Sequence, residues 1–294
     1  MGEKDKAMSL ISPQAVIDPD AHIGQDVRID PFCVVGPDVS IGNGCCLMNN
    51  VTIQGHTEIG AGNVFYSNCV IGVAPQDLKY KGEPTRTIIG DRNVFRESVT
   101  VHRGTEVGGG QTLIGDGNLF MVGVHIAHDC IIGDQVIIGN QTQLAGHVIV
   151  EDFAVISALC GAHHFTTIGR YAYIGGLTPI RRDVPPFTKF DGEVRAINEE
   201  GLKRNGFNDD DIAEIKKAFR LLYRKDGDMM DHLRELRNTT PLNEYVEYLC
   251  SFVEASCQGR FGRFRELQRH DTRSDRVRRL PHEVRNEAVE EEKT

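Results

Sequence analysis

The chain has 294 residues, no tryptophan, and no apolar run close to the ~20 residues that a membrane-spanning helix requires. Its first eight residues are polar and lack the apolar stretch of a secretory signal. None of its eight cysteines forms a Cys-x-x-Cys pair, which argues against a zinc ribbon or a disulfide framework. A net charge of −9 argues against nonspecific nucleic-acid binding. We therefore expect a cytoplasmic protein with no nucleic-acid partner, no stable membrane insertion, and cysteines buried as small apolar side chains.

Apolar residues recur at every sixth position over most of the chain. The series runs from residue 17 to 71, resumes from 89 to 101, and after a shift of one residue continues from 114 to 180. All 25 positions are apolar, most of them Ile, Leu or Val, and glycine often follows directly. Such a repeat is typical of a parallel β-helix, in which three hexads complete one triangular coil. The apolar residue of each hexad would stack on its counterpart in the next coil, about 4.8 Å away.

The regular period also argues against one alternative fold, and its interruptions predict two loops. A β-sandwich, the alternative for a strand-rich chain, has turns every ~8–12 residues without a fixed period, and we disfavour it. Segments 73–86 and 104–111 interrupt the repeat, so we expect them to loop out from the coil, where binding residues are common.

The chain divides into four expected regions: an N-terminal extension (1–14), the β-helix (15–184), a helical C-terminal domain (185–258), and a charged, disordered tail (259–294). The helical domain is indicated by Asn208, which is followed by three aspartates as in a capped helix start. Further helices are expected over 228–237 and from about 241.

Six of the eleven histidines fall between residues 102 and 164. The period of the coil converts sequence into position, because residues three hexads apart lie one above the other on adjacent coils. One patch of the coil therefore gathers His128, Asp129, Gly146, His147, His163 and His164.

Two chemistries fit this patch. In the first, His128 acts as a general base supported by a carboxylate, and Gly146 presents its backbone N–H to a developing oxyanion. In the second, several histidines bind zinc, as in the left-handed β-helix carbonic anhydrases. The His125-x-x-His128 spacing does not decide between them.

Several long motifs carry a family resemblance. They are residues 76–80 (QDLKY), 82–85 (GEPT), 96–105 (RESVTVHRGT), 125–130 (HIAHDC), 144–148 (LAGHV), 198–204 (NEEGLKR) and 206–207 (GF). In these motifs, in their order and over about residues 10–258, the chain resembles the UDP-N-acetylglucosamine O-acyltransferases of lipid A biosynthesis. The resemblance implies a homotrimer of left-handed β-helices, each followed by a small helical domain, with active sites between subunits.

The resemblance also implies a reaction. An R-3-hydroxyacyl chain would pass from acyl carrier protein to the 3-hydroxyl of UDP-N-acetylglucosamine, the first step of lipid A biosynthesis, with no cofactor and no metal. His128 would be the general base, Asp129 its supporting carboxylate, and Gly146 the oxyanion donor.

Further positions that match the family's motifs would contact the substrates. They are Asp77, Lys79, His102, His125, His147, His163 and His164 around the cleft, with Asn198, Glu200 and Arg204 holding the uridine diphosphate.

Three positions bear on how this chain differs within the family. His164 stands where the family usually has Gln, and Asn205 where a second Arg often follows Arg204. The loss of that arginine removes a phosphate contact and would weaken nucleotide affinity by ~1–3 kcal/mol, unless another basic residue takes its place. Gly176 lies at the family's acyl-length ruler, and its lack of a side chain predicts a long hydroxyacyl chain, of about 14 carbons by analogy.

Three rival functions remain at this point. The N-acyltransferase of the same pathway shares the hexads but usually carries an N-terminal domain, for which a coil starting near residue 17 leaves no room. A γ-class-like zinc carbonic anhydrase and a non-catalytic hexapeptide scaffold are the others. The sequence leaves open the role of the tail, the effect of His164, and whether an amino-sugar analogue is the acceptor.

Overall fold

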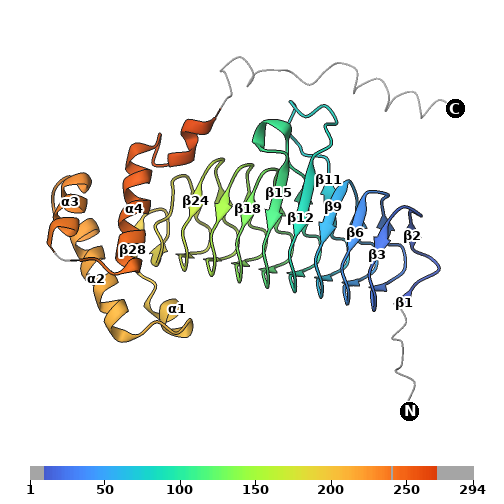
Figure 1. Ribbon diagram of the computed structural model, residues 1–294, viewed down its shortest axis with the longest axis horizontal. Helices are drawn as coiled ribbons and strands as arrows, with labels where there is room; N and C mark the ends of the chain where they lie inside the picture. The colour runs from blue at the N-terminus through green and yellow to red at the C-terminus, as the bar shows by residue number, and fades with distance from the viewer. Residues whose placement is uncertain (1–9, 240, 270–294) are drawn as a thin grey trace, which may run out of the picture.

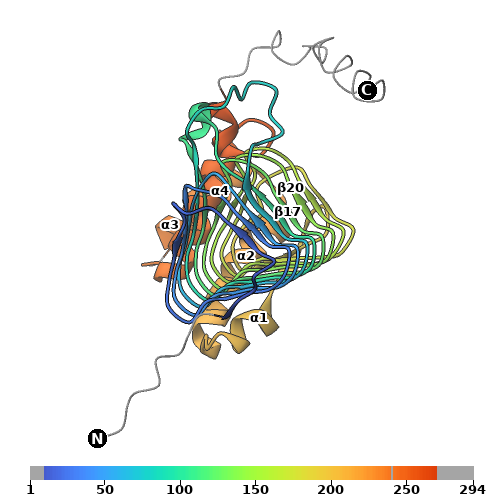
Figure 2. The ribbon, with the colours of Figure 1, turned by 90° about the vertical axis from the view of Figure 1, so that its right-hand side faces the viewer.

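The computed structural model describes residues 10–239 and 241–269, which form a left-handed parallel β-helix followed by four α-helices. Figure 1 shows the coils stacked along the long axis, with the helices at the C-terminal end. Figure 2 shows the triangular cross-section of the prism. Within the described residues, no helix is long and apolar enough to cross a membrane.

Three sheets form the sides of the prism, and each coil adds one short strand to each sheet. Sheet A contains, in spatial order, β1 (Leu10–Ile11), β4 (Arg28–Ile29), β7 (Cys46–Leu47), β10 (Val64–Phe65), β13 (Val94–Phe95), β16 (Leu119–Phe120), β19 (Ile137–Ile138), β22 (Val155–Ile156), β25 (Tyr173–Ile174), β27 (Thr188–Phe190) and β28 (Val194–Ile197). Sheet B contains β2 (Val16–Ile17), β5 (Val34–Val35), β8 (Thr52–Ile53), β11 (Val70–Val73), β14 (Thr100–His102), β17 (His125–Ile126), β20 (Gln143–Leu144), β23 (Gly161–Ala162) and β26 (Pro179–Ile180). Sheet C contains β3 (His22–Ile23), β6 (Val39–Ile41), β9 (His56–Ile59), β12 (Arg86–Ile89), β15 (Gln111–Ile114), β18 (Ile131–Ile132), β21 (Ile149–Val150) and β24 (Thr167–Ile168).

The hexad positions fill the interior of the prism. In uninterrupted coils the strand register advances by three hexads, as in the pairing of Ile132 with Val150. Three phenylalanines replace the usual branched side chain in neighbouring coils of sheet A. Phe65, Phe95 and Phe120 are fully buried, and their ring centroids lie 4.7 and 4.9 Å apart along the stack. These large apolar side chains make the core continuous through the coils that carry the two insertions.

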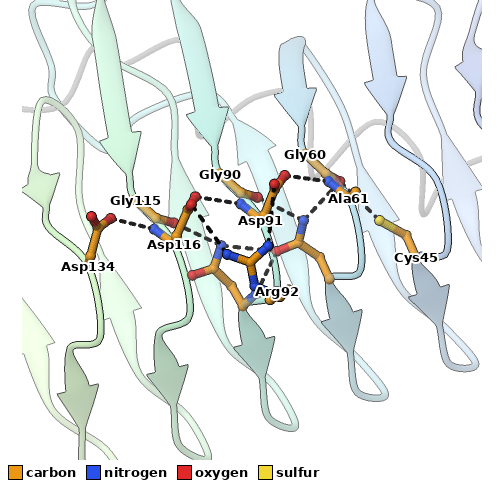
Figure 3. Close-up of polar contacts among 11 residues, drawn as sticks. Cys45, Gly60, Ala61, Gly90, Asp91, Arg92, Gly115, Asp116 and Asp134 are labelled. Atoms are coloured by element: carbon orange, nitrogen blue, oxygen red, sulfur yellow. Dashed lines mark hydrogen bonds and ion pairs between the residues drawn. The ribbon is translucent and has the colours of Figure 1, made fainter.

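A ladder of carboxylates fastens successive coils at the corner between sheets C and A (Figure 3). Oδ1 of Asp116 accepts a 2.8 Å hydrogen bond from the backbone N–H of Asp91, and Oδ1 of Asp134 accepts one of 2.7 Å from Asp116. A Cβ at Gly90 would lie 2.1 Å from Oδ1 of Asp116. Glycine at this corner therefore leaves room for the aspartate of the next coil.

The helices pack on a second apolar cluster at the end of the coil. They are α1 (Glu199–Arg204), α2 (Asp209–Arg224), α3 (Met229–Thr239) and α4 (Glu244–Gln258). As the sequence predicts, Asn208 caps α2, with its side chain accepting from the N–H of Asp211. The short helix α1, capped by Asn198, is an element that the sequence analysis did not predict.

The structure differs from the expected regions at three boundaries. Residues 10–11, expected in an extension, form β1 and pair with β4. Parallel pairing continues beyond 184 to β27, which then turns back into the antiparallel strand β28. Residues 259–269, expected in a disordered tail, fold against the coil and include the 3-10 helix η2 (Phe264–Gln268). Residues 270–294 lie outside the described part of the chain.

Candidate active site

One corner of the prism, between sheets B and C, carries both insertions and the histidine-rich turns. The loop between β11 and β12 and the loop between β14 and β15 leave the coil here, the second containing the 3-10 helix η1 (Glu106–Gly108). The turns that follow β17, β20 and β23 lie on the next three coils. Figure 2 shows the two loops projecting from this corner. Because the insertions and the turns share a corner, residues far apart in sequence meet around one site.

The turn after β17 holds His128 against Asp129. Nδ1 of His128 lies 2.7 Å from Oδ2 of Asp129, and both residues are buried. An ionised carboxylate only accepts hydrogen bonds, so this contact assigns the proton to Nδ1 of a neutral His128. Nε2 is then left as the basic atom of the ring.

Thr105 holds the other side of the carboxylate. Its backbone N–H and its hydroxyl donate to Oδ1 and Oδ2 of Asp129 at 2.8 and 2.6 Å. Burial opposes ionisation of Asp129, but the hydrogen bonds from His128 and Thr105 outweigh it, and the pKa of Asp129 lies below its usual value. Asp129 therefore stays charged beside His128.

Gly146 lies directly over the His128 ring on the next coil. A Cβ on Gly146 would come within 2.4 Å of Cε1 and 2.7 Å of Nε2 of His128. Among the backbone hydrogen bonds of the described residues, none uses the N–H of Gly146. The missing side chain therefore opens both the base and a backbone donor to a ligand.

His147 lies between the carboxylate and an aromatic ring. Its Nε2 is 3.8 Å from Oδ2 of Asp129, and its ring stacks on Phe165 with centroids 4.3 Å apart. Burial lowers the pKa of His147 to about 4, and the charge of Asp129 only partly opposes this shift. His147 is therefore uncharged near neutral pH.

His102 and His125 line a second side of His128. Their rings meet edge to face at 4.6 Å, and Nδ1 of His125 lies 2.7 Å from the hydroxyl of Thr100. Burial lowers the pKa of both, that of His102 to about 4. Two uncharged imidazoles here can exchange hydrogen bonds with hydroxyl groups without adding charge.

Two cavities meet at His128. The larger, of about 780 Å³, lies under the two loops and is lined by Asp77, Lys79, His147, His163 and Arg265 among others. The smaller, of about 400 Å³, lies along sheet B beside His102, His125 and Gly146. Both are also lined by Gln76, His128 and His164. A base at the junction of two cavities can act between two bound molecules.

The loop after β11 carries two of the predicted site residues. The Asp77 side chain accepts from the backbone N–H of Lys79 at 3.0 Å, and its Oδ2 lies 4.0 Å from Nζ of Lys79. Both line the larger cavity. The turn that Asp77 closes therefore directs Lys79 along the cavity wall.

His163 and His164 are exposed at the open side of the site. Nδ1 of His163 lies 3.1 Å from the backbone oxygen of His164, and their rings meet edge to face at 5.6 Å. Although His164 is exposed, desolvation of its ring by neighbouring atoms lowers its pKa, as does the nearby charge of Arg269. His164, at the position where the family usually has Gln, faces both cavities.

The structure does not bring four predicted residues to this site. Asn198, Glu200, Arg204 and Gly176 line neither cavity. Helix α1 lies on the opposite side of the prism from the loops (Figure 2). The Asn198 side chain accepts from Gly201 and donates to the carbonyl of Tyr171. It therefore fixes the start of α1.

Thr105, Phe165 and Arg265 are among the site residues that the sequence did not predict. Thr105 lies in an insertion, Phe165 follows the paired histidines, and Arg265 lies in the segment predicted to be a disordered tail. The sequence could have predicted Phe165, because it follows His147 by three hexads and residues at that spacing lie one above the other on adjacent coils.

The arrangement favours a base and its carboxylate over a metal centre. One ligand atom each of His128, Asp129 and His147 lies within 4.8 Å of the others. Ligand atoms of tetrahedral zinc lie about 3.3 Å apart, given bonds of ~2.0–2.1 Å. The 2.7 Å between His128 and Asp129 is instead a hydrogen-bond distance, and Thr105 donates twice to the same carboxylate. Zinc binding would require these bonds to break.

Comparison with known proteins agrees with this geometry. The model "Bacterial transferase hexapeptide (six repeats)" matches residues 20–55 and 111–146, and domain 2 of "Udp N-acetylglucosamine O-acyltransferase" matches residues 183–261. A curated relative is the acyl-[acyl-carrier-protein]--UDP-N-acetylglucosamine O-acyltransferase of Gloeothece citriformis (strain PCC 7424). It is 47% identical over 212 residues, which cover 70% of this chain and 75% of that protein. The chain belongs to the UDP-N-acetylglucosamine O-acyltransferase family.

Solved structures of UDP-N-acetylglucosamine acyltransferases share the fold. That from Bacteroides fragilis is 40% identical with a TM-score of 0.81, covering 83% of this chain and 97% of its own. That from Arabidopsis is 34% identical with a TM-score of 0.74, covering 84% of this chain and 96% of its own. The family resemblance seen in the sequence motifs is thus confirmed, and with it the acyltransferase class.

Proposed function

We propose that the protein transfers an R-3-hydroxyacyl chain from acyl carrier protein to the 3-hydroxyl of UDP-N-acetylglucosamine, the first step of lipid A biosynthesis. The single observation that carries the proposal is the His128–Asp129 pair at the junction of two cavities, in a chain of this family. Two cavities suit two substrates, and the basic Nε2 lies where they meet.

The proposed reaction is a thioester-to-ester exchange. Nε2 of His128 takes the proton of the sugar hydroxyl as its oxygen bonds to the thioester carbonyl carbon. The charged carboxylate of Asp129 stabilises the imidazolium that forms. When the tetrahedral intermediate collapses, the carbon–sulfur bond breaks and His128 returns the proton to the departing thiolate. The products are the acylated sugar nucleotide and the free thiol of the carrier.

The backbone N–H of Gly146 is the proposed oxyanion donor. It belongs to the residue that covers the His128 ring, and no acceptor in the described chain uses it. A backbone donor fixed by the coil needs no reorganisation as charge develops on the carbonyl oxygen.

We assign the remaining predicted residues to substrate binding. Lys79, oriented by Asp77, and the histidines of the two cavities would contact the sugar and the acyl donor. Gly176 would leave room for the end of the acyl chain.

The uridine diphosphate site would belong to a neighbouring subunit. Glu200 and Arg204 are solvent-facing on α1, on the far side of the prism from the base, so in a homotrimer they would serve the adjoining site. Asn198 would act by capping α1. A cytoplasmic location is supported by eight free cysteines, one of them exposed.

The test combines purified protein, 3-hydroxyacyl carrier protein and UDP-N-acetylglucosamine, and measures carrier thiol release together with the mass of the sugar product. The proposal expects both signals in equal amounts. Acylation of only the 3-amino analogue would assign the amino sugar as the acceptor in place of UDP-N-acetylglucosamine. Thiol release without an acylated sugar, or no turnover with stoichiometric bound zinc, would overturn the proposal.

A further inference from the structure

Residues 260–269, called here the C-terminal arm, return from the end of α4 to the corner that carries the candidate active site. Figure 2 shows the arm beside the two loops, in the dark orange of the last described residues. The match to the family's domain 2 model ends at residue 261, so most of the arm lies beyond it.

A buried carboxylate anchors the arm to the coil. Oδ2 of Asp183 accepts a 2.9 Å hydrogen bond from the backbone N–H of Phe264, and the N–H of Asp183 donates to the carbonyl of Gly262 at 2.7 Å. Within the arm, Arg263 and Glu266 are both buried and form an ion pair of 3.0 Å. These contacts attach the arm to the coil and position the Arg265 side chain at the site.

The arm presents Arg265 to the larger cavity. Nη1 of Arg265 donates to the backbone oxygen of His147 at 2.5 Å, and the side chain lines the same cavity as His128. No carboxylate of the described residues lies within ion-pair distance of its guanidinium, whereas Arg263 and Arg269 both pair with Glu266. Burial lowers the pKa of Arg265, but an arginine remains charged at physiological pH.

A half-buried guanidinium that forms no ion pair with a carboxylate of the described residues can bind a phosphate oxygen. Arg265 has donors left after the contact with His147, and Lys79 lies on the wall of the same cavity. Arg269 also lines this cavity, with its guanidinium 5.0 Å from the Phe165 ring centroid, and is paired with Glu266.

We infer that the C-terminal arm forms a substrate-binding wall of the acyl-transfer cavity, in which Arg265 binds a phosphate group of a substrate. The inference rests on the proposed function. That function offers two sources of phosphate, the diphosphate of the sugar nucleotide and the phosphodiester of the carrier's pantetheine arm.

Arg265 could instead have a purely structural role, which would give different kinetics from phosphate binding. The N–H of His147 donates to the carbonyl of His128 at 3.0 Å, so Arg265 is linked through His147 to the turn that holds the base. If Arg265 only supported that turn, its loss would lower kcat and the melting temperature and leave both KM values unchanged.

The experiment compares full-length wild type, Arg265→Gln, Arg265→Lys and the control Arg260→Gln in acyl transfer. Arg260 is exposed on the same arm and lines neither cavity. Each substrate is varied at saturating concentration of the other. The loss of one charge-assisted phosphate contact predicts a KM increase of about tenfold or more for one substrate in Arg265→Gln, with kcat within about threefold. Arg265→Lys recovers part of that loss because it retains the charge.

The substrate whose KM rises identifies the source of the phosphate. A KM increase for UDP-N-acetylglucosamine assigns the diphosphate, and one for acyl carrier protein assigns the pantetheine phosphodiester. Unchanged KM values in Arg265→Gln, with active wild type and active Arg260→Gln, would overturn the inference and leave the proposed function intact. Inactive wild type and Arg260→Gln would instead overturn the proposed function.

Discussion

The hydroxyl of Thr105 donates a 2.6 Å hydrogen bond to Oδ2 of Asp129, a residue 24 positions further along the chain. The same carboxylate oxygen lies 2.7 Å from Nδ1 of His128. Thr105, in an insertion of the coil, thus orients the Asp129 carboxylate. Asp129 in turn orients the proposed base, His128. In the proposed mechanism, catalysis by His128 would therefore depend on Thr105, which does not itself touch the substrate.

Replacing Thr105 by Val removes the hydroxyl and leaves the backbone donor in place. A hydrogen bond to a charged group contributes about 1.5–3 kcal/mol, so we expect kcat to fall about 10–100-fold. The pKa of Asp129 should rise, because one of the bonds that lowers it is lost. Steady-state acyl transfer at neutral pH measures the fall in kcat. Thr105→Ser keeps the hydroxyl and should stay close to wild type, and equal losses in the two variants would contradict the account.

Replacing Gly146 by Ala should reduce acyl transfer more than stability. The added Cβ would lie 2.4 Å from Cε1 of His128, so the ring must move away from Asp129 and from the backbone donor. We expect kcat to fall at least 100-fold, as a misplacement of about 1 Å can do. Gly36→Ala is the matched control, because its Cβ would meet its nearest atom at an ordinary 3.5 Å. Activity near that of the control would show that the close approach is unimportant.

The repeat allowed much of the site to be predicted from sequence. Because strands of adjacent coils pair with a fixed period, residues three hexads apart must lie next to each other in space. His128 and Gly146, three hexads apart, lie in contact as expected. The period gives no information on segments that leave the coil. Thr105 lies in such a segment, and its contact with Asp129 depends on the fold of η1.

Other parts of the fold had no local signal. Arg265 reaches His147 across 118 residues, and an Arg-rich stretch with few apolar residues is more often typical of a solvated tail. Helix α1 has six residues with a glycine among them, too short and too weak in helix propensity to be recognised. In both cases tertiary contacts determine the conformation.

The anchor of the C-terminal arm predicts a dependence of stability on pH. Burial raises the pKa of Asp183 from 3.8 to about 6. Because this folded-state pKa exceeds that of the unfolded chain, the carboxyl stabilises the fold fully below about pH 4. That contribution, of about 3 kcal/mol, is lost as the pH rises to about 6.

Comparison with Asp183→Asn isolates this contribution, because the other titrating groups are shared. The difference in free energy of unfolding between wild type and variant should decrease from pH 4 to 6 and be constant above. Denaturant titrations at a series of pH values measure it. A difference that is constant from pH 4 to 8 would show that Asp183 does not titrate as the structure implies.

The acyl preference tests the interpretation of Gly176. Its position is open, since an added Cβ would meet no atom closer than 3.5 Å. We expect a preference for a long hydroxyacyl donor, of about 14 carbons by analogy, because each extra buried methylene adds about 1 kcal/mol of discrimination. Competition among carrier-bound donors of different lengths measures the preference. Preferential use of a 10-carbon donor would refute it.

The most direct test of His128 as the base is the rate of acyl transfer by His128→Ala. The control His56→Ala removes a half-exposed histidine from the sheet C face near the start of the coil, outside both site cavities. General base catalysis predicts a loss of kcat of about 10²–10⁴-fold in His128→Ala that still folds, and none in the control. A folded His128→Ala that transfers acyl chains within about threefold of the wild-type rate would contradict the mechanism.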